Sequence, residues 1–168
     1  MNSLPARELA IGFGANLEEP LVTFQKAEEL LAKNPNFCFR AKSSVYLTEP
    51  MGGPSGQNWY HNQVVIYETQ DSPIPILNFL LEVEKSLGRV RKERWGPRII
   101  DLDLLYLGDC VFIDSMLKVP HPRLAERAFT LVPLSEIRPT WIHPELGLTT
   151  SELLHRLPEG EQGLIKLT

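Results

Sequence analysis

The order of secondary-structure signals along this chain predicts an α+β fold in which two helices pack on an antiparallel sheet. Two stretches with helical spacing of apolar residues, 20–33 and 73–87, alternate with stretches of β-favouring residues. The resulting order, β-α-β-β-α-β, is the split βαβ arrangement of a ferredoxin-like sandwich, with the helices on one face of the sheet. The remaining residues predict a short C-terminal extension.

Each predicted element has a local signal. Pro20 suits the first turn of the first helix, Ser72 and Pro73 open the second, and Gly88 ends it. The strand signals are β-favouring or alternating runs at 8–13, 38–47, 62–67 and from Asp101 onward, with a further edge strand expected at 111–113.

Composition and charge limit the class of protein. The 168 residues are 43% hydrophobic and 23% charged, which is ordinary for one globular domain, expected here over residues 1–168. The net charge of −4 disfavours binding of nucleic acid through phosphate neutralisation. The sequence has neither the apolar run of a membrane span nor a secretory signal, and Cys38 and Cys110 are expected to be reduced core residues. We expect a cytoplasmic monomer with no nucleic-acid or membrane partner.

The most informative motif is a pair of carboxylates one residue apart on a predicted strand. Side chains at i and i+2 of a strand point to the same face, so Asp101 and Asp103 should converge. Two adjacent anions in an apolar sheet require a cation, and Mg2+ commonly takes one or two carboxylates together with substrate phosphates. An alternative with equal weight is that nearby arginines neutralise each aspartate.

Arginines precede this strand closely. Arg89, Arg91, Arg94 and Arg98 could hold a polyphosphate through charge-assisted hydrogen bonds. The plainer interpretation is a solvated basic loop. The short distance from Arg98 to the carboxylate pair favours phosphoryl transfer, although the chain has no Walker-type phosphate loop.

Two further positions have both a plain and a functional interpretation. Glu84 falls on the apolar stripe of the second helix, where it either reaches solvent at the edge of the stripe or orients a loop arginine or ligand. His121 lies between two prolines, a context that is usually structural. With Arg123, Arg127 and Phe129 nearby, however, it could contribute to binding a nucleotide.

Four blocks of the sequence resemble the 6-hydroxymethyl-7,8-dihydropterin pyrophosphokinases of folate biosynthesis. The resemblance extends from about residue 11 to 137, and its third block is long and specific. The blocks are Gly14-Ala15-Asn16-Leu17, residues 46–52 with 60–62, Glu84 and residues 87–98 through Asp101 and Asp103, and residues 120–123 with 126–129. The chain departs from the usual Gly-Ser-Asn at Ala15, has Met116 and Lys118 where relatives place other polar groups, and lengthens the loop at 52–60.

The resemblance implies a ferredoxin-like enzyme that transfers pyrophosphate from ATP to the pterin and releases AMP. Two Mg2+ ions would be held by Asp101 and Asp103, and Arg89 and Arg98 would neutralise developing charge. ATP would contact Glu84, Arg91, His121 and Arg127. The pterin would contact Thr48, Met51, Tyr60, Asn62, Trp95 and Phe129, with Tyr60 and Phe129 stacking on its ring. Other folate-pathway enzymes are candidate neighbours.

Two rival functions fit parts of the pattern. A nucleotidyltransferase also uses an Asp-x-Asp strand and two metals, but it releases inorganic pyrophosphate. A non-catalytic ferredoxin-like module or RNA binder is disfavoured by the negative net charge and by the carboxylate pair.

Overall fold

The computed structural model describes residues 3–50, 52–90, 96–158 and 164–167. The elements follow the predicted order and continue beyond it. They are β1 (Arg7–Ala15), α1 (Pro20–Leu31), β2 (Cys38–Lys42), β3 (Tyr46–Thr48), β4 (Tyr60–Thr69), α2 (Pro73–Ser86), β5 (Asp101–Leu107), β6 (Phe112–Ile113), β7 (Lys118–Val119), a 3-10 turn (Leu124–Glu126), α3 (Ala128–Ile137), α4 (Thr150–His155) and β8 (Ile165–Lys166).

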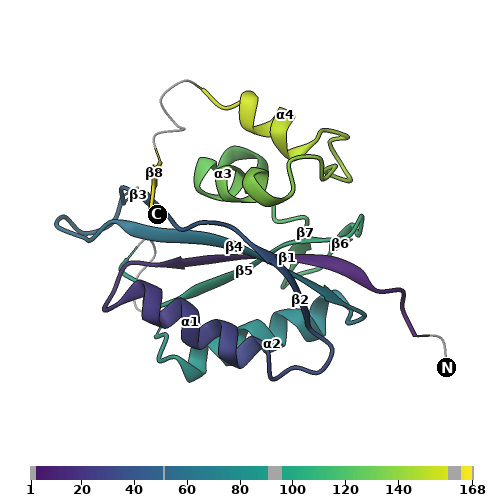
Figure 1. Cartoon of the computed structure of the whole chain (residues 1–168), viewed down its shortest axis with the longest axis horizontal. Coiled ribbons are helices and arrows are strands. Elements are labelled where there is room, and N and C mark those ends of the chain that lie inside the picture. Colours follow the sequence, from purple (N-terminus) through teal and green to yellow (C-terminus); the bar gives the residue numbers. More distant parts are fainter. Residues whose placement is uncertain (1–2, 51, 91–95, 159–163, 168) are drawn as a thin grey trace.

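The main sheet has the strand order β5-β1-β4-β3-β8, and β2 also pairs with β4. All of these pairings are antiparallel. Figure 1 shows α1 and α2 on one face of the sheet and α3 and α4 on the other. The ferredoxin-like α+β prediction is confirmed, and the C-terminal extension adds a partial third layer.

Alternation along the central strands explains why both faces are covered. In β1, Leu9, Ile11 and Phe13 pack in the core beneath α1 and α2. Ala10, between them, belongs to a second core that includes Leu131 of α3. The C-terminal helices cover only part of this second face, and the part nearer Gly12 and Gly14 is left for a pocket.

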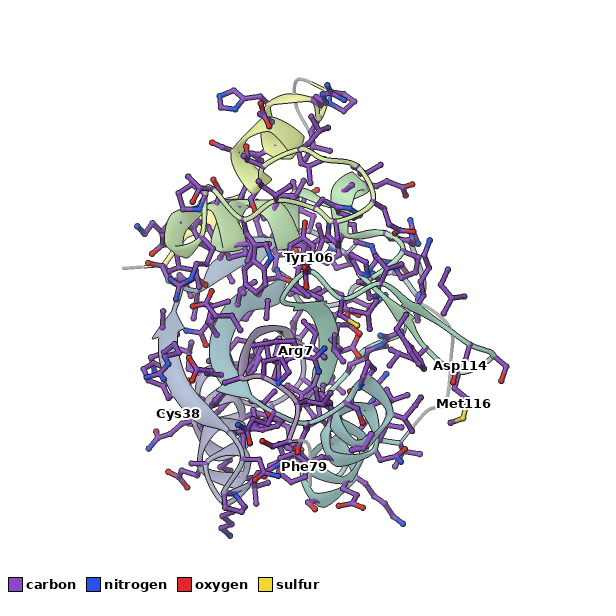
Figure 2. All side chains as sticks on the ribbon, turned by 90° about the vertical axis from the view of Figure 1, so that its right-hand side faces the viewer. Arg7, Cys38, Phe79, Tyr106, Asp114 and Met116 are labelled. Atoms are coloured by element: carbon purple, nitrogen blue, oxygen red, sulfur yellow. The ribbon has the colours of Figure 1, made fainter. Side chains whose placement is uncertain are left out.

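The C-terminal layer is held by aromatic contact and charge. Tyr106 of β5 stacks on Trp141 with ring centroids 5.0 Å apart, and Figure 2 shows it between the sheet and the C-terminal helices. Arg138, which follows α3, donates to Glu8 of β1 from Nη2 at 2.7 Å. These contacts fix α3 over the half of the sheet next to the pocket.

Helix ends follow their sequence signals. α1 and α2 each carry a proline in the first turn, where the missing N–H is not needed. α2 ends before Gly88, which has φ of +89°, a conformation that glycine adopts without a steric penalty. Arg89, the next residue, reaches Asp101 at the start of β5.

Three sequence predictions need correction. Cys38 is exposed at the outer side of the sheet rather than in the core, because β2 pairs on one side only (Figure 2). The single strand expected over 38–47 is divided into β2 and β3. The strand expected at 111–113 pairs with β7 in a separate two-stranded sheet and does not extend the main sheet.

Both cysteines are free thiols, and no helix in the described ranges has the length and hydropathy needed to cross a bilayer.

The second core predicts a measurable cost for truncating α3. Leu134 is fully buried, so Leu134→Ala should lower the free energy of unfolding by about 2–5 kcal/mol through lost burial and a residual cavity. Leu146, 52% exposed, supplies the matched control, and Leu146→Ala should change stability by less than about 0.5 kcal/mol. Equal urea midpoints for the two variants would contradict the packing of α3 on the sheet.

Candidate active site

A pocket of about 890 Å³ lies on the second face of the sheet, beside the start of α3. Its floor is formed by β1 and β4, one wall by β5, and the opposite wall by β3 and Leu164. The lining includes Gly12, Gly14, Thr48, Tyr60, Asn62, Arg98, Asp101, Asp103, Arg123, Arg127, Phe129 and Leu164. Eight of the residues predicted from the sequence are therefore brought together around one cavity.

Two glycines keep the floor of the pocket bare. Gly12 is paired with Asp103 across β1 and β5, and Gly14 is paired with Asp101. A Cβ built at Gly14 would lie 3.9 Å from Asp101 Cβ and 4.0 Å from Asn62 Oδ1, so a larger side chain there would project into the cavity. In the sequence, Gly12 and Gly14 are two residues apart on one strand, as Asp101 and Asp103 are on another. The glycines were not recognised from the sequence as part of the site.

Asp101 is held by two arginines. Arg89 Nη1 donates to Asp101 Oδ1 at 2.8 Å, and Arg98 Nη1 donates to Oδ2. For this residue the ion-pair interpretation describes the structure, since both carboxylate oxygens already have a cationic partner.

Glu84 of α2 forms an ion pair with Arg89, one of these two arginines. It is 3% exposed, its Oε2 lies 2.6 Å from Arg89 Nη1, and its Oε1 accepts a hydrogen bond from the Leu102 backbone N–H at 2.8 Å. Burial raises the pKa of Glu84, while the Leu102 N–H and Arg89 oppose the shift. Glu84 is thus paired with a loop arginine and does not reach solvent at the edge of the stripe.

Asp103 differs from its neighbour. Its side chain forms neither a hydrogen bond nor an ion pair with a described residue, although it is half-buried on the pocket wall. Burial and the charge of Asp101 raise the pKa of the Asp103 carboxyl to about 7. This carboxylate would gain most from a cation in the pocket.

The donor set can be compared with what a metal needs. Among the described residues, no cluster of three or more His, Cys, Asp or Glu side chains could enclose an ion. Asp101 and Asp103 offer only carboxylate oxygens from one strand. Such a partial set fits Mg2+, which retains water and takes further ligands from phosphates, and it does not fit a closed zinc site.

The cationic side of the pocket lies near the start of α3. Arg127 lines the cavity, with its guanidinium carbon 5.3 Å from the centre of the Phe129 ring. Burial lowers the pKa of Arg127, and Arg123 adds to the shift. An anionic ligand would relieve the repulsion between the two arginines.

His121 lies near this group but does not line the cavity. Its Nδ1 accepts a hydrogen bond from the Arg123 backbone N–H at 3.2 Å. Burial, followed by the charge of Arg127, lowers the pKa of His121 to about 4. The imidazole is therefore neutral near pH 7. Among the predicted site residues that the structure describes, Glu84, Arg89 and His121 lie outside the pocket lining.

Amide and hydroxyl side chains of β3 and β4 line a further part of the pocket. Asn62 Nδ2 donates to Thr48 Oγ1 at 3.0 Å and to the Tyr46 carbonyl at 3.3 Å. Tyr60 donates its hydroxyl proton to the Gly96 carbonyl at 2.8 Å. These bonds fix Thr48, Asn62 and Tyr60 in the pocket lining.

Asn16 is a residue that sequence reasoning did not include in the site. It is 1% exposed; its Oδ1 accepts from the Arg98 N–H at 2.8 Å, and its Nδ2 donates to the Asn58 carbonyl at 3.1 Å. The side chain therefore joins the two loops that border the pocket. Met51, Arg91, Arg94 and Trp95, which were also predicted as site or loop residues, lie outside the described residues.

The fold and the pocket define a ferredoxin-like α+β protein whose cavity is lined by carboxylates, arginines, amides and aromatic rings. Residues 10–139 match the family model described as 7,8-dihydro-6-hydroxymethylpterin-pyrophosphokinase, and the chain belongs to this family.

Two bacterial relatives carry the name 2-amino-4-hydroxy-6-hydroxymethyldihydropteridine pyrophosphokinase. The protein from Methylorubrum extorquens is 39% identical over 151 residues, which cover 89% of this chain and 94% of the relative. The protein from Pseudomonas aeruginosa is 36% identical over 148 residues, covering 88% and 90% of the two chains.

Solved structures agree on the fold. The structure of Plasmodium falciparum HPPK-DHPS, wild type with pteroate, is similar with a TM-score of 0.71 at 13% identity, over 93% of this chain. The chain spans less than half of that protein, 43% of its length.

The shifted pKa of His121 predicts a pH dependence of stability. The group is neutral in the folded protein down to about pH 4, whereas in the unfolded chain it gains a proton near pH 6.5. The unfolded state therefore binds more protons as pH falls through this window, and His121 makes the protein less stable toward pH 4.

We expect His121→Gln to lose less unfolding free energy than the wild type between pH 7 and pH 4.5, measured by urea denaturation at both values. The exposed His155 provides the comparison variant, His155→Gln. The burial argument fails if His121→Gln and the wild type lose the same amount.

Proposed function

We propose that the chain transfers the β,γ-pyrophosphoryl group of ATP to 6-hydroxymethyl-7,8-dihydropterin and releases AMP, a step of folate biosynthesis. The observation that carries this proposal is that one pocket is lined by a carboxylate pair, arginines, two aromatic rings and amide side chains. Membership of the pyrophosphokinase family and the names of its relatives support it. In this proposal residues 1–168 act as one catalytic domain.

Asp101 and Asp103 are proposed to hold Mg2+ when ATP is bound. The metal supplies positive charge that bridges phosphate oxygens and stabilises the attacking and leaving oxygens in an in-line displacement. The Asp103 side chain forms no ion pair with a described residue, which leaves its oxygens open to a metal and supports this role.

The two arginines on Asp101 have different freedom to move. Arg89 is 10% exposed and is also held by Glu84, whereas Arg98 is 31% exposed and has Asp101 as its carboxylate partner. We therefore assign to Arg98 the exchange from Asp101 to a phosphate oxygen of ATP. Arg89 would remain as a fixed charge that holds Asp101 in place.

The remaining residue assignments divide the pocket lining between ATP and the pterin. ATP would lie on the side of Arg127, near His121, with Arg91 as a further contact by resemblance. We propose that Glu84 contributes through Arg89, since its carboxylate is already occupied by Arg89 and the Leu102 N–H.

The pterin is proposed to stack on Tyr60 and Phe129, with Asn62 and Thr48 at its polar edge. The hydrogen bonds already fixing Asn62 and Tyr60 mean that these groups are positioned before the substrate arrives. Met51 and Trp95 are further pterin contacts by resemblance.

The nucleotide product tests the reaction. Incubation with ATP, Mg2+ and the pterin should yield AMP and the pterin diphosphate in equal amounts, measured by liquid chromatography with mass detection. Inorganic pyrophosphate as the product would indicate nucleotidyl transfer, and no pterin-dependent AMP would reject the proposal.

Substitution of either carboxylate should affect kcat and the free energy of unfolding differently. Asp101→Asn and Asp103→Asn should each lower kcat by about 100-fold or more, because each removes a metal-binding charge. Asp101→Asn should also destabilise the fold, since Arg89 and Arg98 lose their partner, whereas Asp103→Asn should leave the unfolding free energy unchanged or higher. The exposed Asp109 gives the control, Asp109→Asn. Wild-type kcat in both test variants would exclude the metal assignment.

Arg98 should matter more for chemistry than for binding. Its charge would stabilise the transferred group most when negative charge develops, so Arg98→Ala should lower single-turnover rates by about 100-fold. The Kd of a non-hydrolysable ATP analogue should change less. Arg156→Ala, at an exposed position of the C-terminal layer, is the control. A rise in the ATP KM with unchanged single-turnover chemistry would show that Arg98 only binds the nucleotide.

A further inference from the structure

The last described strand, β8, lies next to the wall of the pocket. The family match ends at residue 139, yet β8 pairs with β3 at the edge of the main sheet (Figure 1). Leu164, immediately before β8, lines the same cavity as the carboxylate pair. A segment outside the matched region therefore reaches the site.

The strand register sets the direction of this segment. Tyr46 is opposite Lys166 and Leu47 is opposite Ile165, so the same antiparallel register brings Leu164 beside Thr48. Residues directly opposite share a face of the sheet, and both Thr48 and Leu164 do line the pocket. Ile165 alternates to the other side and is 52% exposed.

Two contacts of this segment hold β8 in register. The Leu167 N–H donates to the Val45 carbonyl at 2.8 Å, and Lys166 Nζ lies 4.0 Å from Glu136 Oε1 of α3. Glu136 also accepts a hydrogen bond from Ser44 Oγ at 2.8 Å and another from the Tyr46 hydroxyl. Glu136 thus ties α3, β3 and β8 together beside the pocket.

The position of β8 decides which substrate it can meet. In the sheet order β5-β1-β4-β3-β8, the carboxylates of β5 and the leucine next to β8 lie at opposite edges. Triphosphate and metal belong at the β5 edge, close to Asp101, Asp103 and Arg98. The β8 edge adjoins Thr48 and Tyr60, and an aliphatic side chain there suits the face or rim of a flat heterocycle.

We propose that Leu164 is a specificity-determining residue that contacts the acceptor heterocycle, and that β8 exists to place it there. This inference rests on the proposed function, because it takes the pterin as the acceptor. It assigns to the C-terminal strand a role in selecting the acceptor and none in binding ATP.

Two variants and one matched control test the assignment. Leu164→Ala removes the contact, deletion of residues 164–168 removes the strand, and Ile165→Ala truncates the neighbour that faces away from the pocket. The KM for the pterin should rise about 5- to 20-fold in the first two variants, as expected for loss of an apolar contact, and stay within about 2-fold in the control. The KM for ATP should change by less than about 2-fold in all three.

Binding measurements separate this inference from the reaction itself. Calorimetry with a non-hydrolysable ATP analogue and Mg2+ shows that a variant is folded, and titration of the pterin into that complex gives its Kd. An unchanged pterin Kd in both Leu164→Ala and the deletion overturns the inference, as does an equal loss in Ile165→Ala. If the wild type binds the pterin but forms no AMP, the proposed reaction fails while the Kd comparison still decides the role of Leu164. If the wild type binds no pterin, both fail.

Discussion

The chain of charges from Glu84 through Arg89 to Asp101 is the constraint on which the site depends. Glu84 is buried on the sheet-facing side of α2, where a lone carboxylate would cost several kcal/mol, and it is stabilised by Arg89 and the Leu102 N–H. Arg89 in turn forms an ion pair with Asp101, the first residue of β5. The helix, the turn at Gly88 and β5 are therefore held together by one set of ion pairs. The Asp103 side chain, on the same strand, forms no ion pair with a described residue.

The second face of the sheet is divided between packing and binding. Over Ala10, Ile66 and Tyr106 the C-terminal layer closes the core, whereas at Gly12 and Gly14 β1 has no side chains and leaves space. Asn16, immediately after β1, connects the loops at 58 and 98 beside that space. By alternation and choice of residue, β1 thus contributes to the cores on both faces and to the bare floor of the pocket.

Much of the fold, and the common direction of the two carboxylates, could be predicted from the sequence. Helix periodicity, prolines at helix starts and Gly88 gave the order and ends of the elements, because these signals are local. The two-residue period of Asp101 and Asp103 gave their common direction for the same reason. What failed or was missed depends on long-range pairing: the exposure of Cys38 on an edge strand, the β6-β7 pairing, the loop contacts of Asn16, and the return of Leu164 beside Thr48. None of these has a periodic signature, since each is set by where a distant segment docks.

The central claim is that Asp103, with Asp101, holds the cation that the nucleotide brings. The most direct measurement is electron paramagnetic resonance of Mn2+, which accepts the same oxygen ligands as Mg2+, titrated into the protein with a non-hydrolysable ATP analogue. We predict two bound ions per chain in the wild type, and a weakened or lost ion in Asp103→Asn while the analogue still binds. The same number of ions with the same affinity in both proteins would contradict the account.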